Sequence, residues 1–242
     1  MTLIDFGPYY SSTGNIMQLD YAQKAADTGM NALGMCNTNG IVIAVQKKVD
    51  PLEIMSSNHH IKNIGDKIFL TYSGEDSDFI LFHNLMKNEI MNDLDYRNST
   101  TVGKYKELTK YFFSTFSSHN ACRPLGCNIL AGIKQNDTYH LISTNPSSLT
   151  LHYKSHVIGK SSSTAKTELE KINIEALSID QMVENIIRVI YKSHDPLVDT
   201  DEFTIEVAIL SKETDNKFKR LEYEEIEGYI EMYKDMIYEE TS

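Results

Sequence analysis

The residues best suited to bind phosphate lie in the second half of the chain. Gly159-Lys160-Ser161 matches the end of a phosphate-binding loop, in which backbone N–H groups and a lysine surround the phosphates. The GxxxxGK pattern also requires a glycine at position 154, where this chain has Lys154. The serines that follow are better explained as caps of the next helix. We therefore expect no nucleotide site at this segment.

Histidines and cysteines are the next residues that could do chemistry. His152 and His156 have a spacing found in metal sites, but their neighbours favour short strands, and no cysteine or acid cluster lies nearby. The pair His59-His60 is typical of a solvated loop. Apart from Arg123, Cys122 and Cys127 have no basic neighbour, which favours packing in the core or a turn. Three cysteines indicate free thiols in a reducing compartment, and we expect no metal and no cofactor.

The elements that would position these residues begin with an N-terminal arm over residues 1–13. Apolar residues at steps of three and four predict a helix over 15–28, with Asn15 as its N-cap. Two short apolar runs follow over residues 31–46, and Asn39-Gly40 between them is a strong signal for a hairpin turn. A helix followed by a hairpin is therefore expected near the N-terminus.

The rest of the chain predicts a sandwich of sheets and helices. Two short strands within 61–74 precede amphipathic helices over 76–93 and 102–118. The later elements are strands at 125–133, 138–143 and 202–210, a hairpin of 149–153 with 156–158, helices at 164–172 and 178–191, and an acidic helix over 221–242. This order fits an α+β fold of four layers, αββα, over residues 31–210, in which two antiparallel sheets stack between pairs of helices.

Composition limits the domain organisation and the classes of partner. The chain has 242 residues, 41% of them hydrophobic, and no internal repeat or linker rich in Gly, Pro or Ser, which predicts a single domain over 1–242. The formal net charge of -11 argues against a nucleic-acid partner. No apolar run could cross a bilayer, and the N-terminus lacks the pattern of a secretory signal, so we expect no membrane partner.

Four stretches resemble the α-type subunits of the 20S proteasome. Gln18-Leu19-Asp20-Tyr21-Ala22 is similar to the Gln-Val-Glu-Tyr-Ala helix of that family, although Ser12 and Asn15 replace the proline and arginine that usually precede it. Cys122-Arg123-Pro124-Leu125-Gly126-Cys127 resembles the family's Arg-Pro-Phe-Gly-Cys turn. The strongest similarity is to the α type-3 member, which holds the seventh position of the α ring, and it is carried by Ile158-Gly159-Lys160 and Ala165-Lys166-Thr167-Glu168-Leu169-Glu170-Lys171.

This resemblance implies the sandwich fold of the N-terminal nucleophile hydrolases with an extra N-terminal helix. Active proteasome subunits use an N-terminal threonine supported by an acid and a lysine. Alignment by the first hairpin places Met30, Gln46 and His60 at these three positions. A thioether cannot attack a carbonyl, and a neutral amide cannot hold a lysine charged. The resemblance therefore implies a noncatalytic subunit of a threonine-type endopeptidase complex, with no catalytic residue.

The resemblance also implies residues that take part in gating and regulator binding. Asp5 and Tyr21 match two members of a cluster that stabilises the open gate and contacts neighbouring subunits. The tyrosine and the turn proline of that cluster are replaced by Ile4 and Ser12. Regulators insert C-terminal tails between α subunits, where a lysine usually meets the tail carboxylate. That position is His60 here, so we expect a weak or absent tail pocket.

The implied partners are other proteasome α subunits, the adjacent β ring, and a regulatory particle on the outer face. The implied role is ring assembly, gating of substrate entry and docking of regulators in ubiquitin-dependent protein degradation, in the cytoplasm and nucleus. Two alternatives remain from the sequence. One is an active N-terminal nucleophile hydrolase that requires processing, and the other is a free-standing binding module of the same fold.

Overall fold

Two antiparallel sheets of five strands each form the centre of the computed structural model, which describes residues 7–54, 58–92, 102–119, 121–194 and 202–241, and side chains up to Tyr233. The first sheet has the order β10-β9-β2-β1-β8, and the second has the order β3-β4-β5-β6-β7. The first consists of β1 (Ala32–Cys36), β2 (Gly40–Lys48), β8 (Ser155–Ile158), β9 (Phe203–Ser211) and β10 (Phe218–Arg220). The second consists of β3 (Lys62–Ile64), β4 (Ile68–Gly74), β5 (Cys127–Gln135), β6 (Thr138–Thr144) and β7 (Thr150–Tyr153).

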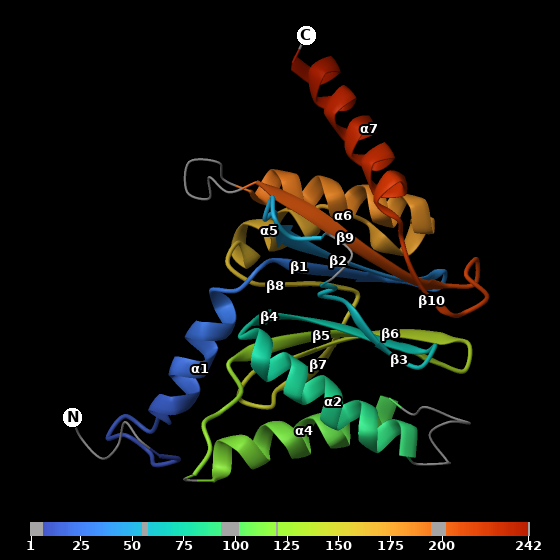
Figure 1. Ribbon diagram of the computed structural model, residues 1–242. Helices are drawn as coiled ribbons and strands as arrows, with labels where there is room; N and C mark the ends of the chain where they lie inside the picture. Colours follow the sequence, from blue (N-terminus) through green and yellow to red (C-terminus); the bar gives the residue numbers. More distant parts are fainter. Residues whose placement is uncertain (1–6, 55–57, 93–101, 120, 195–201, 242) are drawn as a thin grey trace.

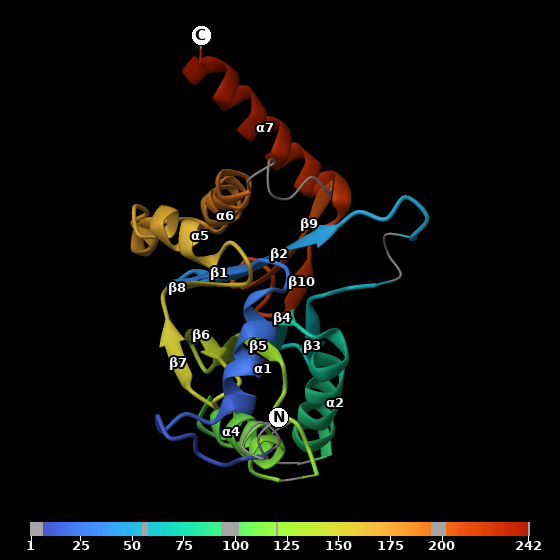
Figure 2. The same ribbon diagram turned by 90° about the vertical axis from the view of Figure 1, so that its left-hand side faces the viewer.

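Helices cover the outer faces of both sheets (Figures 1 and 2). The first sheet is covered by α5 (Ser162–Leu169) and α6 (Ile179–Ser193), and the second by α2 (Asp76–Asn92) and α4 (Val102–Ser118). The helix α1 (Met17–Asp27) packs against β4 and β5, and α7 (Tyr223–Thr241) extends away from the sheets beyond its first turns. The expected four-layer αββα sandwich with an additional N-terminal helix is confirmed.

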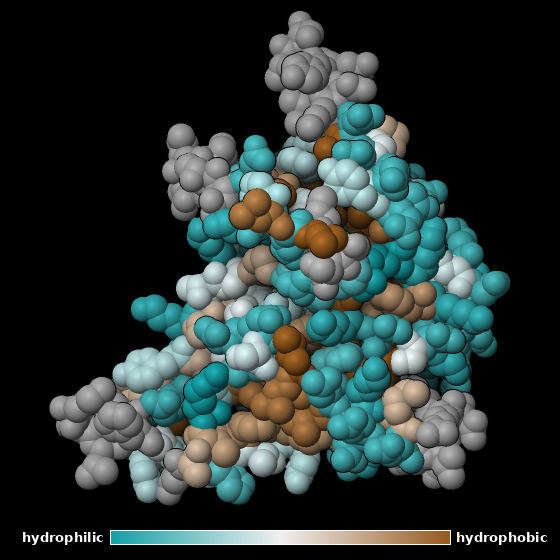
Figure 3. Space-filling model, viewed as in Figure 1, coloured by the Kyte–Doolittle hydropathy of each residue, from teal (hydrophilic) through white to brown (hydrophobic). Residues whose placement is uncertain are grey.

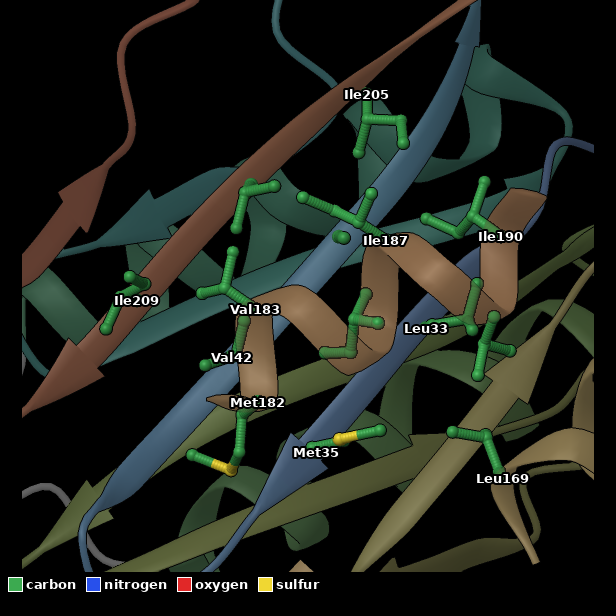
Figure 4. Packing of buried hydrophobic residues seen from close by; sticks show 14 of the residues in the cluster. Leu33, Met35, Val42, Leu169, Met182, Val183, Ile187, Ile190, Ile205 and Ile209 are labelled. Carbon is green, nitrogen blue, oxygen red and sulfur yellow. The ribbon is translucent and has the colours of Figure 1, made fainter. Parts of the chain in front are cut away.

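Strand β2 shows how the sequence specifies the layers. Ile41, Ile43 and Val45 lie in the core between the two sheets, whereas the alternate residues Val42 and Ala44 pack against the helices. Because both faces of β2 are buried, its sequence is continuously apolar instead of alternating with polar residues. Figure 4 shows the helix side of this arrangement, in which Val183 and Ile187 of α6 lie over the first sheet.

The expected hairpin of 149–153 with 156–158 is wrong. Strand β7 pairs with β6, whereas β8 pairs with β1 in the other sheet, so the chain passes from one sheet to the other at Lys154. The rings of Tyr153 and His156 stack across this passage with centroids 4.0 Å apart. His152 instead faces His140 across the β6–β7 pair, with ring centroids 5.5 Å apart. The four-residue spacing of His152 and His156 therefore places them in different sheets.

Two local expectations also differ from the structure, and one short strand was not foreseen. The residue at the N-cap of α1 is Ile16, because Asn15 is held in a preceding turn in which its N–H donates to Ser11 Oγ. The two residues that close the first hairpin are Thr38 and Asn39, since the Asn37 N–H donates to the carbonyl of Gly40. The short strand β10 was not predicted from the sequence.

Burial of His156 makes stability depend on pH. Burial, aided by Lys166, lowers its pKa from 6.5 to about 4, so the folded state binds the proton less readily than the unfolded state. Its contribution to stability is therefore complete above pH 6.5 and is lost as the pH falls towards 4. The unfolding free energy of the parent chain should fall between about pH 7 and 4.5. In His156→Phe, which keeps a ring against Tyr153, we expect this fall to be smaller by about 1–3 kcal/mol. Urea denaturation at both pH values measures this, and equal losses in both proteins would contradict it.

Candidate functional site

A small hollow lies between the end of α1 and the first strand pair. It has a volume of about 170 Å³, and both Met30 and Gln46 line it. Lys48, Lys160 and Glu202 contribute charged groups to its rim. The structure thus brings together two of the three residues that align with the catalytic positions of active subunits.

A pair of neutral amides occupies the floor of this hollow. The side-chain amide of Asn31 donates to Gln46 Oε1 at 2.7 Å, and the Gln46 N–H donates to the Asn31 carbonyl at 2.9 Å. Gln46 Nε2 lies 3.3 Å from His194 Nδ1. Asn31 and Gln46 are both buried, so their hydrogen bonds fix the side chains in place. No charge is present at Gln46 to pair with a catalytic lysine.

The segment Gly159-Lys160-Ser161 is hydrogen-bonded to the residues on either side of Met30, to the backbone of Gly29 and to the side chain of Asn31. The Lys160 N–H donates to the Gly29 carbonyl at 3.1 Å, and the Ser161 N–H donates to Asn31 Oδ1 at 2.7 Å. Gly159 has φ +111, and a Cβ there would lie 2.4 Å from the Met30 carbonyl oxygen. These N–H groups are therefore used within the fold, and the glycine is required by close backbone contact.

The hydroxyl that lines the hollow belongs to Thr28, and its geometry does not suit a nucleophile. Thr28 Oγ1 donates to the Ala25 carbonyl at 2.9 Å, at the C-terminal end of α1. Nucleophilic catalysis by a hydroxyl requires a base within hydrogen-bond distance, and a carbonyl oxygen is not such a base. Met30 follows the end of α1 after Thr28 and Gly29, and its thioether carries no hydroxyl or thiol that could act as the nucleophile.

His60 does not line this hollow, and it is not part of a solvated pair. Its side chain is buried, stacks on Tyr72 with ring centroids 5.9 Å apart, and has no hydrogen-bond partner at Nδ1. Burial lowers the pKa of His60, which favours a neutral ring. The expectation of a solvated loop is therefore wrong for His60, although its neighbour His59 is partly exposed.

Glu206 holds the segment that contains His60. Its carboxylate accepts the N–H of His60 at 2.8 Å and the N–H of Ile61 at 3.3 Å. Arg220 Nε donates to the same carboxylate at 2.8 Å and its guanidinium also donates to the Ile61 carbonyl at 2.6 Å. The Glu206 side chain is only 10% exposed, so these donors replace the water that a carboxylate would otherwise require.

Strand register explains why His60 and Gln46 do not meet. Glu206 lies opposite Val45, and Gln46 lies opposite Ile205. Successive side chains of a strand point to opposite faces. Glu206 therefore points to the space between the sheets, with His60 beside it, whereas Gln46 points towards the helix layer. The side chains of Met30, Gln46 and His60, which align with the three catalytic positions, therefore do not meet at one site.

The predicted gate residues lie at and before α1. Tyr21 is 49% exposed on α1, and Tyr9 and Tyr10 of the arm are exposed as well. Asp5 lies outside the described residues, so its contact with Tyr21 stays a prediction. The helix buries Ala22 and Ala26 and leaves its remaining side chains exposed or partly so. A polar contact joins it to the second sheet, where Asn128 Nδ2 donates to Asp27 Oδ1 at 2.9 Å.

Two polar residues that organise this region, Asn31 and Glu206, were not predicted from the sequence. Glu206 had a usable signal, because it is a single acid within the strongly apolar strand β9. A buried acid in such a strand requires donors, which the sequence does not identify. Asn31 had no such signal, since it resembles an ordinary turn residue before β1.

The described residues hold no helix that is both long and apolar enough to cross a membrane. Within the same parts of the chain, no three or more His, Cys, Asp or Glu side chains come together in a way that could hold a metal ion.

Comparison with known proteins identifies relatives along nearly the whole chain. The family described as "Proteasome: Proteasome subunit" matches residues 26–210. The chain is 36% identical over 236 residues to "Probable proteasome subunit alpha type-7" of Encephalitozoon cuniculi, covering 97% of each chain. It is 28% identical over 212 residues to "Proteasome subunit alpha type-3" of Acanthamoeba castellanii, covering 87% of this chain and 84% of that one. It is 26% identical over 224 residues to "Proteasome subunit alpha type-2" of Trypanosoma brucei brucei, covering 92% of this chain and 95% of that one.

Proposed function

The chain belongs to the proteasome subunit family as an α-type subunit of the 20S core, and we propose that it serves this core without hydrolysing peptides itself. The observation that carries the proposal is the hollow at Met30. It combines the thioether of Met30 with the neutral amide pair of Asn31 and Gln46. An N-terminal nucleophile hydrolase requires a hydroxyl or thiol, a free amine and a supporting acid at these places.

Its proposed work is assembly of the α ring, gating of substrate entry and docking of regulators during ubiquitin-dependent protein degradation. The proposed partners are neighbouring α subunits, the adjacent β ring and a regulatory particle on the outer face, in the cytoplasm and nucleus. The partly exposed α1 and its arm support contacts with neighbours. The buried, neutral ring of His60 supports a weak or absent pocket for regulator tails at this subunit, because it offers no exposed cation.

The surface also favours a subunit over a free monomer. Figure 3 shows hydrophobic side chains grouped over the region of α2, where Ile80 and Leu81 are 40% and 41% exposed. Tyr9 and Tyr10 are 53% and 73% exposed on the arm. Grouped apolar side chains on a surface usually mark a contact with another protein. We place the subunit at the α type-3 position because of its resemblance over 158–171.

Native mass spectrometry of the chain, isolated from its own cells by a C-terminal tag, tests this function. We expect a large particle that contains several related α- and β-type chains. We also expect this chain to remain uncleaved between Gly29 and Met30, because the Gly29 carbonyl and Asn31 are bound to the 160–161 segment. The masses of its neighbours would also test the ring position.

Two other results would contradict the proposal. A chain that begins at Met30 would indicate processing of the kind that an active hydrolase requires. A monomer or homo-oligomer without related chains would support a free-standing binding module of the same fold.

A further inference from the structure

An open groove of about 790 Å³ runs between α6, α7 and the β9–β10 turn. It forms because α7 contacts α6 and β9 near its start and then extends away from the helix layer (Figures 1 and 2). Its apolar surface comes from Ile209 of β9, Leu221 before α7, and Met232 of α7, which is 50% exposed. This groove lies apart from the hollow at Met30 and from the segment at His60.

Acidic side chains surround the apolar surface of the groove. Asp180, Glu184, Glu213 and Glu225 contribute carboxylates to it. Lys219 is the cation of the lining, and its Nζ lies 3.0 Å from Glu225 Oε1, so its charge is already paired within the chain. The groove thus combines apolar contact surface with an excess of negative charge.

Ser211 provides an independent indication that a ligand binds there. It lines the groove, is fully buried, and its Oγ has no hydrogen-bond partner. In β9 it has the same orientation as Ile209, two residues earlier, which also lines the groove. A buried hydroxyl is normally hydrogen-bonded, so this atom has capacity for a partner that enters the groove.

Gly228 leaves room on the α7 side. A Cβ at this position would meet no atom within 4 Å, although the residue lies inside a helix and lines the groove. Glycine inside a helix is less stable than alanine, and neither a steric clash nor an unusual backbone angle requires it here. Its lack of a side chain therefore widens the groove without serving the packing of the chain.

We propose that this groove binds a short basic, amphipathic segment of a partner protein. Apolar side chains of that segment would pack on Ile209, Leu221 and Met232. Its Lys or Arg side chains would face Glu184 and Glu213, and a polar group would bond to Ser211 Oγ. Helices that dock in grooves combine apolar anchors with flanking charges in this way.

A synthetic peptide of Lys and Leu with a photoreactive group tests the proposal on the full-length chain, in the assembly in which it purifies. We expect crosslinks within 179–184 and 209–232 that weaken with added salt. Gly228→Leu fills the groove and should reduce the yield of crosslinked peptide by about tenfold or more, as loss of a contact at the centre of an interface does. The matched control is Gly103→Leu on α4, where a Cβ also meets no atom within 4 Å.

The design separates binding in the groove from folding and from general charge attraction. Both variants should melt at or above the temperature of the parent chain, because leucine favours a helix more than glycine does, and both should keep its assembly state. A Glu and Leu peptide of the same pattern should give little crosslinking. An equal yield with the acidic peptide, an unchanged yield in Gly228→Leu, or crosslinks confined to other surfaces would each overturn the proposal.

Discussion

Replacing Glu206 with alanine should lower the unfolding free energy by about 3–5 kcal/mol, the effect seen when one partner of a buried ion pair is removed. The carboxylate accepts hydrogen bonds from the N–H groups of His60 and Ile61 and from the guanidinium of Arg220. Without it, the guanidinium loses its ion-pair partner at a position where it is only 28% exposed. Two backbone N–H groups also lose their acceptor, which adds to the loss of stability.

Chemical denaturation of the purified chain measures this loss. Glu224→Ala is the control, because Glu224 is an exposed acid in the first turn of α7 and should change stability by less than about 0.5 kcal/mol. Glu206→Gln should give an intermediate loss, since an amide oxygen can accept one N–H but supplies no charge for Arg220. Equal stability of Glu206→Ala and Glu224→Ala would show that the carboxylate does not hold the 60–61 segment.

The layers of the fold were predictable because the apolar residues that each helix or strand buries recur at a regular spacing in the sequence. Strand β2 is continuously apolar, and α6 has apolar residues on one face with Ser178 and Gln181 forming a capping box at its start. Such local signals determine which face of an element is buried. They also limited the arrangement to two sheets between helix layers, which the structure confirms.

Pairing between distant strands was not predictable from the same signals. Strands β7 and β8 have the length and composition of a hairpin, and only their partners β6 and β1 separate them into different sheets. Strand β10 has just three residues and exists because it pairs with β9. Burial of His60 depends in the same way on Glu206, which is far away in the sequence.

The hollow at Met30 was partly predictable. Alignment placed Met30 and Gln46 in related positions, and the structure brings both to the same hollow. The hydrogen bond from Asn31 to Gln46 was not foreseen, because it depends on the exact register of β1 with β2. Strand register also directs Glu206 and Gln46 to opposite faces, which a linear alignment cannot represent.

Close backbone contact at Gly74 connects the fold to the proposed function. Gly74 has φ +112, and a Cβ there would lie 2.2 Å from the Gly126 carbonyl oxygen and 2.8 Å from Ala26 Cα. Beside it, Ser73 Oγ donates to the Ala26 carbonyl at 2.7 Å. A Cβ on Gly29 would in turn lie 2.0 Å from the Gly74 nitrogen. The last turn of α1 therefore packs directly against the end of β4.

Gly74→Ala should displace α1 and prevent incorporation of the chain into the large particle. Backbone strain and steric overlap should lower its unfolding free energy by about 3 kcal/mol or more. Gly65→Ala is the matched control, because Gly65 also has a positive φ of +63 but its Cβ would meet no atom within 4 Å. The unfolding free energy of the control should fall by only about 1 kcal/mol, and the control should still assemble. The fraction of tagged chain in the particle, together with hydrogen exchange of α1, distinguishes the variants. Normal incorporation of Gly74→Ala would mean that the position of α1 does not determine assembly, because the control already accounts for the strain of a positive φ.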